Sequence, residues 1–582
     1  MHLGIDLGTS SIKMGMIDRQ GRFINLLGAG RMIPTVAVYV PRTDRLYFGS
    51  EAVGLREPGM EAGKFFKVEI KRNPGYHLGP FNLTEIITQL LKWLYQQYVA
   101  KKAEPVQTVN IGIPNYFGLK ARQVVLAAAH TVFSGVPIRL VPEPLAALVG
   151  LLREWVVGDQ ASLMGNLMVV DIGGGTADVS FVHLSRSEGT RAILEAHLQS
   201  GSDVFSGAEV DKAVLRQVLI PRFELETGQR IASHLKKEKG IQGGEGYRYA
   251  RMLSRAEEIK IGLAEKDEIR VDIPDFYRGR SLNTVLMQED MRPALDSTLR
   301  TLRQFIKSEV RDRARQAGLY NRGCWQFDQV VLMGGASRLP GVREVLAELG
   351  VKILQPREPE FYVVRGLSAL VGSSDGPGGL EMRVIFPFRF YIEKRKTGKF
   401  DSRVLEAISF DTANLELDPD GIYRLFSVPF DSAYNLGRED ERFEIRVYQG
   451  EEGGEEAVDR IRIDNESLVL DFSARREDIE GEMVDIYLDL GASCLRTSRE
   501  KEAEQPGKVE RDGKRLWQEA LGRQESTTAA ARYLQGQGAH PALNNFAERL
   551  QVLKEGSPYQ NYDDFMVAKL LAFFEVLTHE KK

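Results

Sequence analysis

The sequence predicts an α/β protein with two related halves that face each other across a cleft, followed by an antiparallel β region and C-terminal helices. Three observations lead to this prediction. A glycine-turn hairpin occurs twice, at domain spacing. Segments typical of strands alternate with segments typical of helices through the first two thirds of the chain, and the pattern changes to alternating strands after a glycine-rich linker.

Residues 166–182 predict two β-strands joined by a glycine turn. The run 167–170 is apolar enough for a strand buried on both faces, and 179–182 supplies the returning strand. Three glycines let the backbone turn tightly and approach a ligand without a Cβ in the way: Gly173, Gly174 and Gly175. Asp171, Thr176 and Asp178 surround the turn, and such groups suit a phosphate that carries a magnesium ion. Alone, the segment also fits an ordinary β-turn with solvated aspartates.

A second copy of this hairpin strengthens the phosphate interpretation. Residues 4–17 have the same plan, with Asp6 at the end of a strand, Gly8, Thr9 and Ser10 at the turn, and a returning strand. One phosphate hairpin repeated at domain spacing indicates two halves that grip a polyphosphate from both sides.

Composition limits the classes of partner and compartment. The 582 residues are 43% hydrophobic and 27% charged, with a net charge of −4, which favours neither nucleic acid nor a membrane surface as a partner. Cys324 and Cys494 are far apart and lack metal-type spacing, as expected in a reducing compartment. The first strand begins at Met1, and no apolar run reaches membrane-spanning length. We therefore expect a cytoplasmic protein without a signal peptide.

Between the two hairpins, strands and helices alternate. Residues 31–40 predict a strand entered through a proline, 82–98 a helix with apolar residues at helical spacing, and 119–130 a second helix. The basic stretch 65–75 ends in a turn, and its Lys71 could reach a terminal phosphate or be a solvated surface lysine. Glu143 lies between two prolines after a predicted strand, where it could orient a water molecule or begin a helix and interact with its dipole.

After the second hairpin, a glycine-punctuated loop over 201–210 leads into a helix. Glu257 and Lys260 lie one turn apart on the predicted helix 251–263, where a modest surface ion pair would explain them equally well. Residues 330–343 predict a strand, a glycine turn and a helix. The small residues Gly334 and Gly335 would let a flat base or sugar lie against the backbone, with Arg338 available to stack.

The last third of the chain has a different pattern. Residues 373–379 have linker composition, and 384–490 alternate polar and apolar residues in several short runs, which predicts a half-buried antiparallel sandwich. A charged break at 496–514 precedes two stretches with helical patterns, about 513–535 and 541–580.

The order of these motifs resembles the nucleotide-binding domain of the heat-shock protein 70 (DnaK-like) chaperones, within the fold shared by actin, hexokinase and chaperone ATPases. The matching segments are 4–17, 31–40, 69–75, 109–123, 138–150, 167–182, 201–211, 256–264, 330–342 and 358–370. The resemblance implies a two-lobed actin-like ATPase with ribonuclease-H-like halves over 1–372 and a linker over 373–384. It further implies a peptide-binding-like β-sandwich over 385–508 and a short helical lid over 509–582, although the likeness is fainter there.

The same resemblance implies that ATP and Mg²⁺ bind between the lobes and that ATP is hydrolysed slowly to ADP and phosphate. Asp6 and Asp171 would hold the metal through its waters, since Mg²⁺ keeps a largely hydrated shell. The turn amides of both hairpins would cradle the β- and γ-phosphates: Gly8, Thr9, Ser10, Gly173, Gly174 and Gly175.

The remaining roles follow from the same resemblance. Lys71 would neutralise charge on the γ-phosphate, Glu143 would orient water, and Thr176 and Asp178 would lie beside the γ-phosphate. Adenosine would lie between a helix and a glycine loop: Glu257, Lys260, Gly334, Gly335 and Arg338. Extended or unfolded polypeptide, a J-domain protein and a nucleotide-exchange factor are the implied partners.

The sequence departs from the family at several positions. Ser10 replaces a threonine, and Ile261 and Ala264 stand where polar groups are usual, so we expect looser recognition of the base. The linker segment 380–384 carries Glu381 and Arg383 where the family has leucines. Burying either charge costs several kcal/mol unless it is paired, so either the docking groove carries matching charges or the linker does not dock. We favour the second alternative, which predicts a holder chaperone with weak ATP-driven release.

Three functions remain open from the sequence. The first is an ATP-driven chaperone that binds extended polypeptide, and it has the most motifs in its favour. The second is an actin-like scaffold whose last third is an interaction module. The third is a regulatory ATP sensor that uses the altered linker for one dedicated protein partner.

Overall fold

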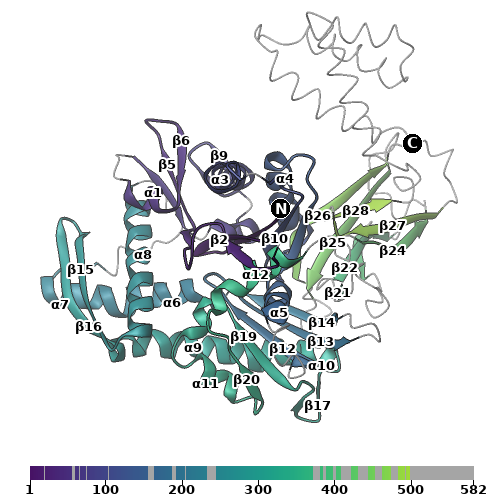
Figure 1. Cartoon of the computed structure of the whole chain (residues 1–582). Coiled ribbons are helices and arrows are strands. Elements are labelled where there is room, and N and C mark those ends of the chain that lie inside the picture. The colour runs from purple at the N-terminus through teal and green to yellow at the C-terminus, as the bar shows by residue number, and fades with distance from the viewer. Residues whose placement is uncertain are drawn as a thin grey trace, which may run out of the picture.

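The computed structural model describes residues 1–370 except for short gaps, together with strands between 380 and 497 (Figure 1). The gaps are 19, 56–58, 65, 74, 103, 155–162, 187–191, 204 and 232–243. The described segments beyond 370 are 380–383, 389–396, 402–407, 421–429, 443–451, 462–472, 483–491 and 493–497.

Two mixed sheets with the same strand plan form the centre of the molecule. The first has the order β11-β10-β1-β2-β3, and the second has the order β20-β19-β12-β13-β14 with β21 added at its edge. In each, three consecutive strands form an antiparallel meander, a later strand pairs in parallel with the first of them, and a further strand pairs in parallel with that later strand. The predicted duplication of one half is therefore confirmed, and the two-lobed α/β architecture with it.

The strands of the two sheets match the apolar runs of the sequence. In the first sheet they are β1 His2–Leu7, β2 Ser11–Ile17, β3 Phe23–Asn25, β10 Thr108–Ile113 and β11 Ile138–Pro142, with β4 Ile33–Pro34 paired to β2. In the second they are β12 Gly165–Ile172, β13 Ala177–Arg186, β14 Ala192–Ser202, β19 Gln329–Met333, β20 Lys352–Leu354 and β21 Leu380–Arg383. The central parallel strands β10 and β19 are buried along their whole length, as strands covered on both faces must be.

Two helices cross between the sheets and join the halves. These are α5 Glu143–Glu154 and α12 Tyr362–Ala369, which pack on each other and against strands of the first sheet. Glycines permit the close crossing, because a Cβ on Gly366 would collide with the carbonyl of Ala146 and one on Gly150 with the carbonyl of Tyr362. Glu143 is thus the first residue of a helix at the junction of the lobes.

Other helices cover the sheets and build the outer parts of each half. The described ones are α1 Gly49–Gly54, α2 Phe66–Arg72, α3 Leu83–Leu94, α4 Leu119–Val132, α6 Gly207–Val214, α7 Ile220–Thr227, α8 Gly244–Glu265, α9 Arg292–Phe305, α10 Arg311–Gln316 and α11 Val342–Ala347. Asn82 caps α3 with a capping box completed by Glu85, which explains why the helix begins there. None of the helices in the described part of the chain is long and apolar enough to span a membrane.

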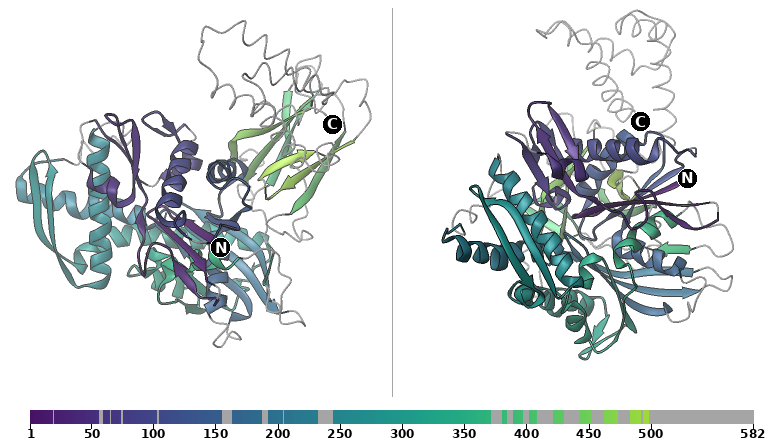
Figure 2. Two further views of the ribbon diagram at one scale, coloured as in Figure 1. Left: turned by 45° about the horizontal axis from the view of Figure 1, so that its top comes forward. Right: turned by 60° about the vertical axis from the view of Figure 1, so that its left-hand side comes forward.

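Smaller sheets extend each half on the same side of the molecule (Figures 1 and 2). The first half carries β5 Val36–Val40, β6 Arg45–Phe48 and β7 Glu61–Lys64, and the second carries the hairpin β15 Glu268–Tyr277 and β16 Arg280–Met287. Two-stranded pairs are β8 His77–Leu78 with β9 Phe81–Asn82, and β17 Tyr320–Asn321 with β18 Cys324–Trp325. The two outer parts meet through β7 and α8, which contact each other.

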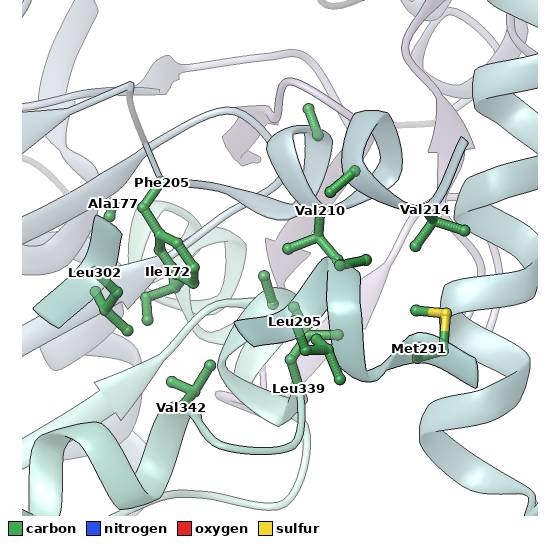
Figure 3. Packing of buried hydrophobic residues seen from close by; sticks show 14 of the residues in the cluster. Ile172, Ala177, Phe205, Val210, Val214, Met291, Leu295, Leu302, Leu339 and Val342 are labelled. Carbon is green, nitrogen blue, oxygen red and sulfur yellow. The ribbon is translucent and has the colours of Figure 1, made fainter. Parts of the chain in front are cut away.

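The core of the second half reaches up to its hairpin turn. Ile172 and Ala177, the residues that flank the glycine turn, pack in one buried cluster with Phe205 and Val210 (Figure 3). All of them are almost completely excluded from solvent. Close packing of this kind fixes side chains in single rotamers, so the residues on both sides of the glycine turn are held in fixed positions.

The expectation that the linker does not dock is wrong for this structure. Leu380–Arg383 forms strand β21, which pairs in parallel with β14 and extends the second sheet. The pairing is made by backbone hydrogen bonds, so it does not require uncharged side chains. Its register places Arg383 opposite Glu195, and Met382 packs against the buried cluster that contains α5. Residues 373–379, the first part of the predicted linker, lie outside the described residues.

Beyond the linker the described strands form two antiparallel sheets, as the alternating pattern predicts. One is β23-β22-β25-β26, with bounds Ser402–Ala407, Arg389–Lys396, Phe443–Glu451 and Arg462–Phe472. The other is β24-β27-β28, with bounds Ile422–Pro429, Met483–Asp489 and Cys494–Thr497. Ile486 and Leu488 of β27 are fully buried in one cluster with residues of α5 and β12. The predicted lid over 509–582 lies outside the described residues.

Candidate functional site

The turns of the two hairpins meet at the centre of the molecule. A Cβ added to Gly174 would collide with Ser10, and one added to Gly175 would collide with Thr9. Only glycine allows the second turn to approach the first this closely. The structure therefore brings together the turn residues that the sequence assigned to a phosphate, from Gly8 to Ser10 on one side and from Gly173 to Gly175 on the other.

Helix α6 begins on the second turn. The backbone amide of Gly207 donates to Gly173 O at 3.0 Å, and that of Ala208 donates to Gly174 O at 2.6 Å. Ser206 caps the helix by accepting from Glu209 N. These hydrogen bonds fix the backbone conformation of the turn. A backbone site for phosphate needs such a fixed conformation before the ligand binds.

Four of the described carboxylates lie buried around the two turns: Asp6, Glu143, Asp171 and Asp178. Burial, followed by repulsion from Glu143, raises the pKa of Asp171 well above its ordinary value. The same two causes, in the same order, raise the pKa of Asp178 to about 7. Glu143 also has a raised pKa, mainly through burial, although attraction to Lys67 opposes the change. Because burial and mutual repulsion disfavour the ionised forms of these carboxylates, a cation that enters the cleft would relieve the repulsion and bind favourably.

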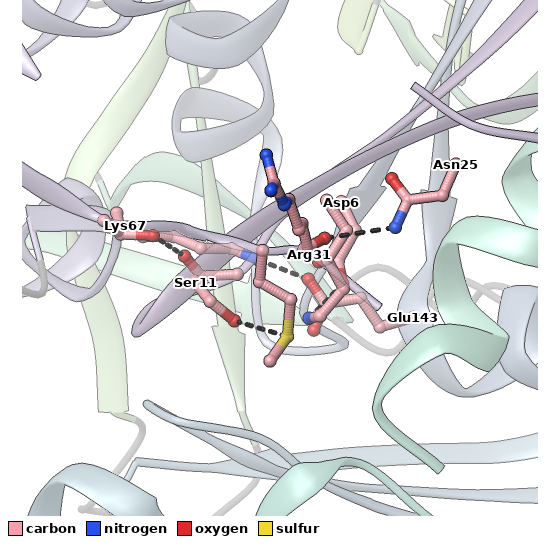
Figure 4. Close-up of polar contacts among 10 residues, drawn as sticks. Asp6, Ser11, Asn25, Arg31, Lys67 and Glu143 are labelled. Carbon is pink, nitrogen blue, oxygen red and sulfur yellow. Dashed lines mark hydrogen bonds and ion pairs between the residues drawn. The ribbon is translucent and has the colours of Figure 1, made fainter. Parts of the chain in front are cut away.

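Two lysines that sequence reasoning missed enter this cluster. Lys13 Nζ donates to Asp6 Oδ2 at 2.9 Å, and Lys67 Nζ contacts Glu143 Oε1 (Figure 4). Burial lowers the pKa of Lys13, but attraction to Asp6 and to further carboxylates outweighs it, and the pKa lies above its ordinary value. Lys71, the lysine that the motif selected, lies with its Nζ 5.2 Å from the centre of the Tyr116 ring.

A usable signal existed for both missed lysines. Lys13 is the third residue of the returning strand, where antiparallel pairing sets it opposite Asp6. Lys67 and Lys71 are four residues apart on α2, so both can face the same side of that helix. The motif alone could not show which of the two reaches Glu143.

Asp178 is held by the backbone of the other half. Asn115 N donates to Asp178 Oδ1 at 2.8 Å, and the amide side chain of Asn115 donates to Val179 O and to Ser200 O, both at 3.1 Å. Asn115 follows β10 in the first half, whereas Asp178 is on β13 in the second. The loop after β10 therefore positions a carboxylate of the opposite hairpin.

Two of the residues assigned to adenosine, Glu257 and Lys260, form ion pairs with different partners. Lys260 Nζ lies 2.7 Å from Asp211 Oδ1 and donates to Gly207 O at 3.1 Å, whereas Glu257 Oε2 accepts from Lys64 Nζ at 2.7 Å. The Lys64–Glu257 pair joins β7 of the first half to α8 of the second. Helix α8 is thus held by ion pairs both to helix α6 and to the opposite lobe.

The glycine loop after β19 lies directly on the hairpin strand. Gly334 has a φ of +79°, and a Cβ there would collide with Asp171 Oδ1 and Ile172 O. Arg338 follows on the loop, with its guanidinium 3.5 Å from Glu360 and 3.6 Å from Glu265. Ile261 of α8 is 52% exposed, so the structure leaves an apolar side chain at the surface of this helix.

The donor set fits a hydrated magnesium ion with phosphates. Among the residues that the structure describes, no three His, Cys, Asp or Glu side chains converge as a direct metal site. Asp6 and Asp171 supply hard oxygen atoms from opposite halves, and Ser10 Oγ is buried with no hydrogen-bond partner. Mg²⁺ keeps several waters and binds through a few carboxylates plus substrate phosphates, which matches this arrangement.

The raised pKa of Asp178 predicts a pH-dependent stability of the chain without nucleotide and metal. The folded state binds this proton more tightly than the unfolded state, whose ordinary pKa is 3.8, so stability falls as pH rises between about 4 and 7. A tenfold difference in proton affinity between the two states corresponds to roughly 1.4 kcal/mol of stability. We expect the Tm of Asp178→Asn, relative to the parent, to be higher at pH 8 than at pH 5.

Thermal unfolding at the two pH values measures this difference directly. Asp296→Asn, on an exposed position of α9, is the control and should differ from the parent equally at both pH values. A Tm difference for Asp178→Asn that does not change with pH would contradict the prediction.

Sequence comparisons agree with the geometry of the lobes. The profile of the family described as Hsp70 protein matches residues 64–359, about half of the chain. The chain is 25% identical over 396 residues to the chaperone protein DnaK of Elusimicrobium minutum, covering 64% of this chain and 58% of that protein. It is 26% identical over 322 residues to the chaperone protein DnaK of Thermus thermophilus, covering 54% of this chain and 46% of that protein.

The chain spans about half the length of the curated relatives that it matches. The matched region contains the second hairpin, α5, α8 and the glycine loop, which carry most of the site described above. Because the family profile covers half of the chain and the fold is the duplicated two-lobed one, the protein belongs to the Hsp70 family, as a divergent member.

Proposed function

We propose that this protein is an ATP-dependent molecular chaperone. Its lobes bind ATP with Mg²⁺ and hydrolyse it slowly to ADP and phosphate, and its C-terminal β region, proposed to be a sandwich, holds and releases extended polypeptide. The observation that carries the proposal is the meeting of the two hairpin turns, which gathers buried carboxylates, two lysines and an unpartnered hydroxyl at one point. The curated relatives are named as chaperone proteins, which supports the same function.

The residues of the cleft suit phosphoryl transfer to water. Catalysis of this kind depends on positioning and electrostatic stabilisation. A bound Mg²⁺ would neutralise charge on the β- and γ-phosphates, with Asp6 and Asp171 holding it through water. The turn amides would orient the phosphates, and Thr176 and Asp178 would lie beside the γ-phosphate. Exclusion of water from the buried carboxylates strengthens each of these interactions.

Glu143 and one lysine would act on the reacting groups. Glu143 begins α5 at the junction of the lobes, where it can orient the attacking water. We assign the stabilisation of γ-phosphate charge to Lys67, because it contacts Glu143 inside the cleft. The sequence motif assigns the same role to Lys71, and the two assignments differ in a measurable way.

The nucleoside would lie between α8 and the loop that follows β19. Glu257, Lys260, Gly334, Gly335 and Arg338 would surround it, with Arg338 available to stack on the base. The ion pairs of Glu257 and Lys260 hold α8 against both lobes, so the nucleoside pocket would close when the lobes close. A J-domain protein and a nucleotide-exchange factor are the proposed partners, in the cytoplasm.

The described contacts also support coupling between nucleotide and peptide. Strand β21 is part of the second sheet, and β27 shares a buried cluster with α5 and β12. A change in the lobes would therefore reach the C-terminal strands through packed elements. For such coupling, the two arrangements must differ in their affinity for ATP.

The test uses the full-length chain. We expect slow ATP turnover in Mg²⁺ that EDTA abolishes, and binding of a fluorescent extended peptide whose dissociation rate differs between ATP and ADP. Absence of ATP binding in Mg²⁺ would contradict the proposal. A peptide dissociation rate that is the same in ATP and in ADP would contradict it as well.

A glycine variant tests whether the turns are the phosphate cradle. Gly174→Val should weaken ATP binding by at least about tenfold, because the added side chain meets Ser10 and separates the turns. Gly54→Ala is the matched control, since an added Cβ there has nothing within 4 Å. Unchanged ATP affinity in Gly174→Val, measured by equilibrium titration, would place the nucleotide elsewhere.

A further inference from the structure

We propose that Lys13 is a built-in cation of the phosphate cleft, whose ammonium group lets the cleft retain a polyphosphate even without a divalent metal. This inference rests on the proposed function, because it presumes that the cleft binds a nucleotide. It adds a phosphate-binding residue that the motifs of the sequence do not assign.

Lys13 occupies a fixed place beside the first turn. Its strand, β2, pairs with β1 so that Lys13 lies directly opposite Asp6, and its Nζ is 2.9 Å from Asp6 Oδ2. The side chain is buried, so the ammonium cannot turn out to solvent. The long lysine side chain has thus lost most of its conformational entropy before any ligand binds. Binding of a phosphate therefore does not have to supply the free energy of ordering this side chain.

The surroundings of the ammonium extend beyond a local ion pair. Asp6 and Lys13 belong to the first half, yet Asp171 of the second half and Glu143 at the junction also attract the charge of Lys13. An ion pair that only stabilised the β1–β2 hairpin would act within one half. The charge of Lys13 instead acts where the two turns meet, which is the place proposed for the phosphates.

The balance of charge in the cleft indicates that Lys13 supplies positive charge for a polyphosphate when no metal ion is bound. Lys13 pairs with Asp6 and Lys67 pairs with Glu143, while no ion pair involves Asp171 or Asp178 in the described part of the chain. Of the two carboxylates proposed to hold the metal through water, Asp6 is thus already paired with Lys13, whereas Asp171 has no ion-pair partner among the described residues. Without that ion, a polyphosphate would enter a cleft whose positive charge comes from Lys13 and Lys67, so loss of Lys13 would leave strong repulsion.

The experiment compares binding with and without metal in the full-length chain. ATP and inorganic tripolyphosphate are titrated by calorimetry, once in excess Mg²⁺ and once in EDTA. We expect the parent to bind ATP in EDTA within about a hundredfold of its affinity in Mg²⁺, because the fixed ammonium replaces part of the attraction of the metal.

Two substitutions separate the charge of Lys13 from its hydrogen bond. Lys13→Gln keeps an N–H donor for Asp6 and removes the charge, whereas Lys13→Arg keeps the charge. We expect Lys13→Gln to weaken binding of both ligands in EDTA by at least about tenfold, and in Mg²⁺ by no more than about threefold. Lys13→Arg should restore most of the metal-free binding.

The outcomes that overturn the proposal are distinct. An equal loss of affinity in Mg²⁺ and in EDTA for Lys13→Gln would show that the pair is only structural. A parent that binds ATP in Mg²⁺ but shows no binding in EDTA would overturn the proposal even if Lys13→Gln does not fold. A parent that fails to bind ATP in Mg²⁺ would instead overturn the proposed function itself.

Discussion

Replacing Lys67 by methionine should lower kcat for ATP hydrolysis by about a hundredfold or more and change the Kd for ATP only a few-fold. Lys67 Nζ contacts Glu143 Oε1 in the buried cleft, beside the residue proposed to orient water. A cation at this place meets charge that develops on the transferred phosphoryl group, so it stabilises the transition state more than the bound state. Single-turnover hydrolysis and equilibrium binding of ATP, both in excess Mg²⁺, separate the two effects.

Lys71→Met is the matched control for this variant. Lys71 is on the same helix, one turn later, with its ammonium over the ring of Tyr116. We expect its loss of kcat to be at least about tenfold smaller than that of Lys67→Met, since removal of a group outside the developing charge costs less. A larger loss of kcat in Lys71→Met than in Lys67→Met would show that Lys71 stabilises the charge of the γ-phosphate, as the sequence motif predicts. Undiminished single-turnover rates in both variants would contradict either assignment.

This choice between two lysines shows where sequence reasoning ends. The turns could be predicted because glycine runs, an adjoining aspartate and two apolar strands form a pattern that few other structures satisfy. Duplication of that pattern correctly predicted two sheets of one plan. The pairing of Asp6 with Lys13 depends on hairpin register, and that of Lys67 with Glu143 on how α2 sits against α5. The first relation joins residues of one hairpin but requires its exact register, whereas the second joins residues 76 positions apart in the chain.

The linker shows a different limit of prediction from the sequence. Its charges argued against burial, because an apolar groove would leave Glu381 or Arg383 unpaired. The structure docks the segment through its backbone as a sheet strand, with Met382 packed on the core. The error came from treating docking as a property of side chains, whereas a sheet edge binds any segment that can supply N–H and C=O groups in extended form.

Docking of the linker reverses the expectation for peptide release. We expect ATP to accelerate release of a bound peptide from the full-length chain between about fivefold and 150-fold, the range of typical coupling free energies. Met382→Pro should abolish most of this acceleration. Proline removes both the N–H of this position and the Met382 side chain that packs on the buried cluster, so it should weaken the attachment of the four-residue edge strand β21 to β14. ATP hydrolysis by the variant should persist, because the hairpin turns are far from β21 in the sheet register.

The matched control is Met382→Leu, which keeps both the N–H group and an apolar side chain against the cluster that contains α5. Its peptide dissociation rates in ATP and ADP, measured by competition with unlabelled peptide, should equal those of the parent. A Met382→Pro variant that still releases peptide faster in ATP would show that coupling does not pass through β21. The remaining route would then be the buried contact of β27 with α5 and β12, where Ile486 and Leu488 lie. A parent that releases peptide at the same rate in ATP and ADP would show that a docked linker alone does not couple the two sites.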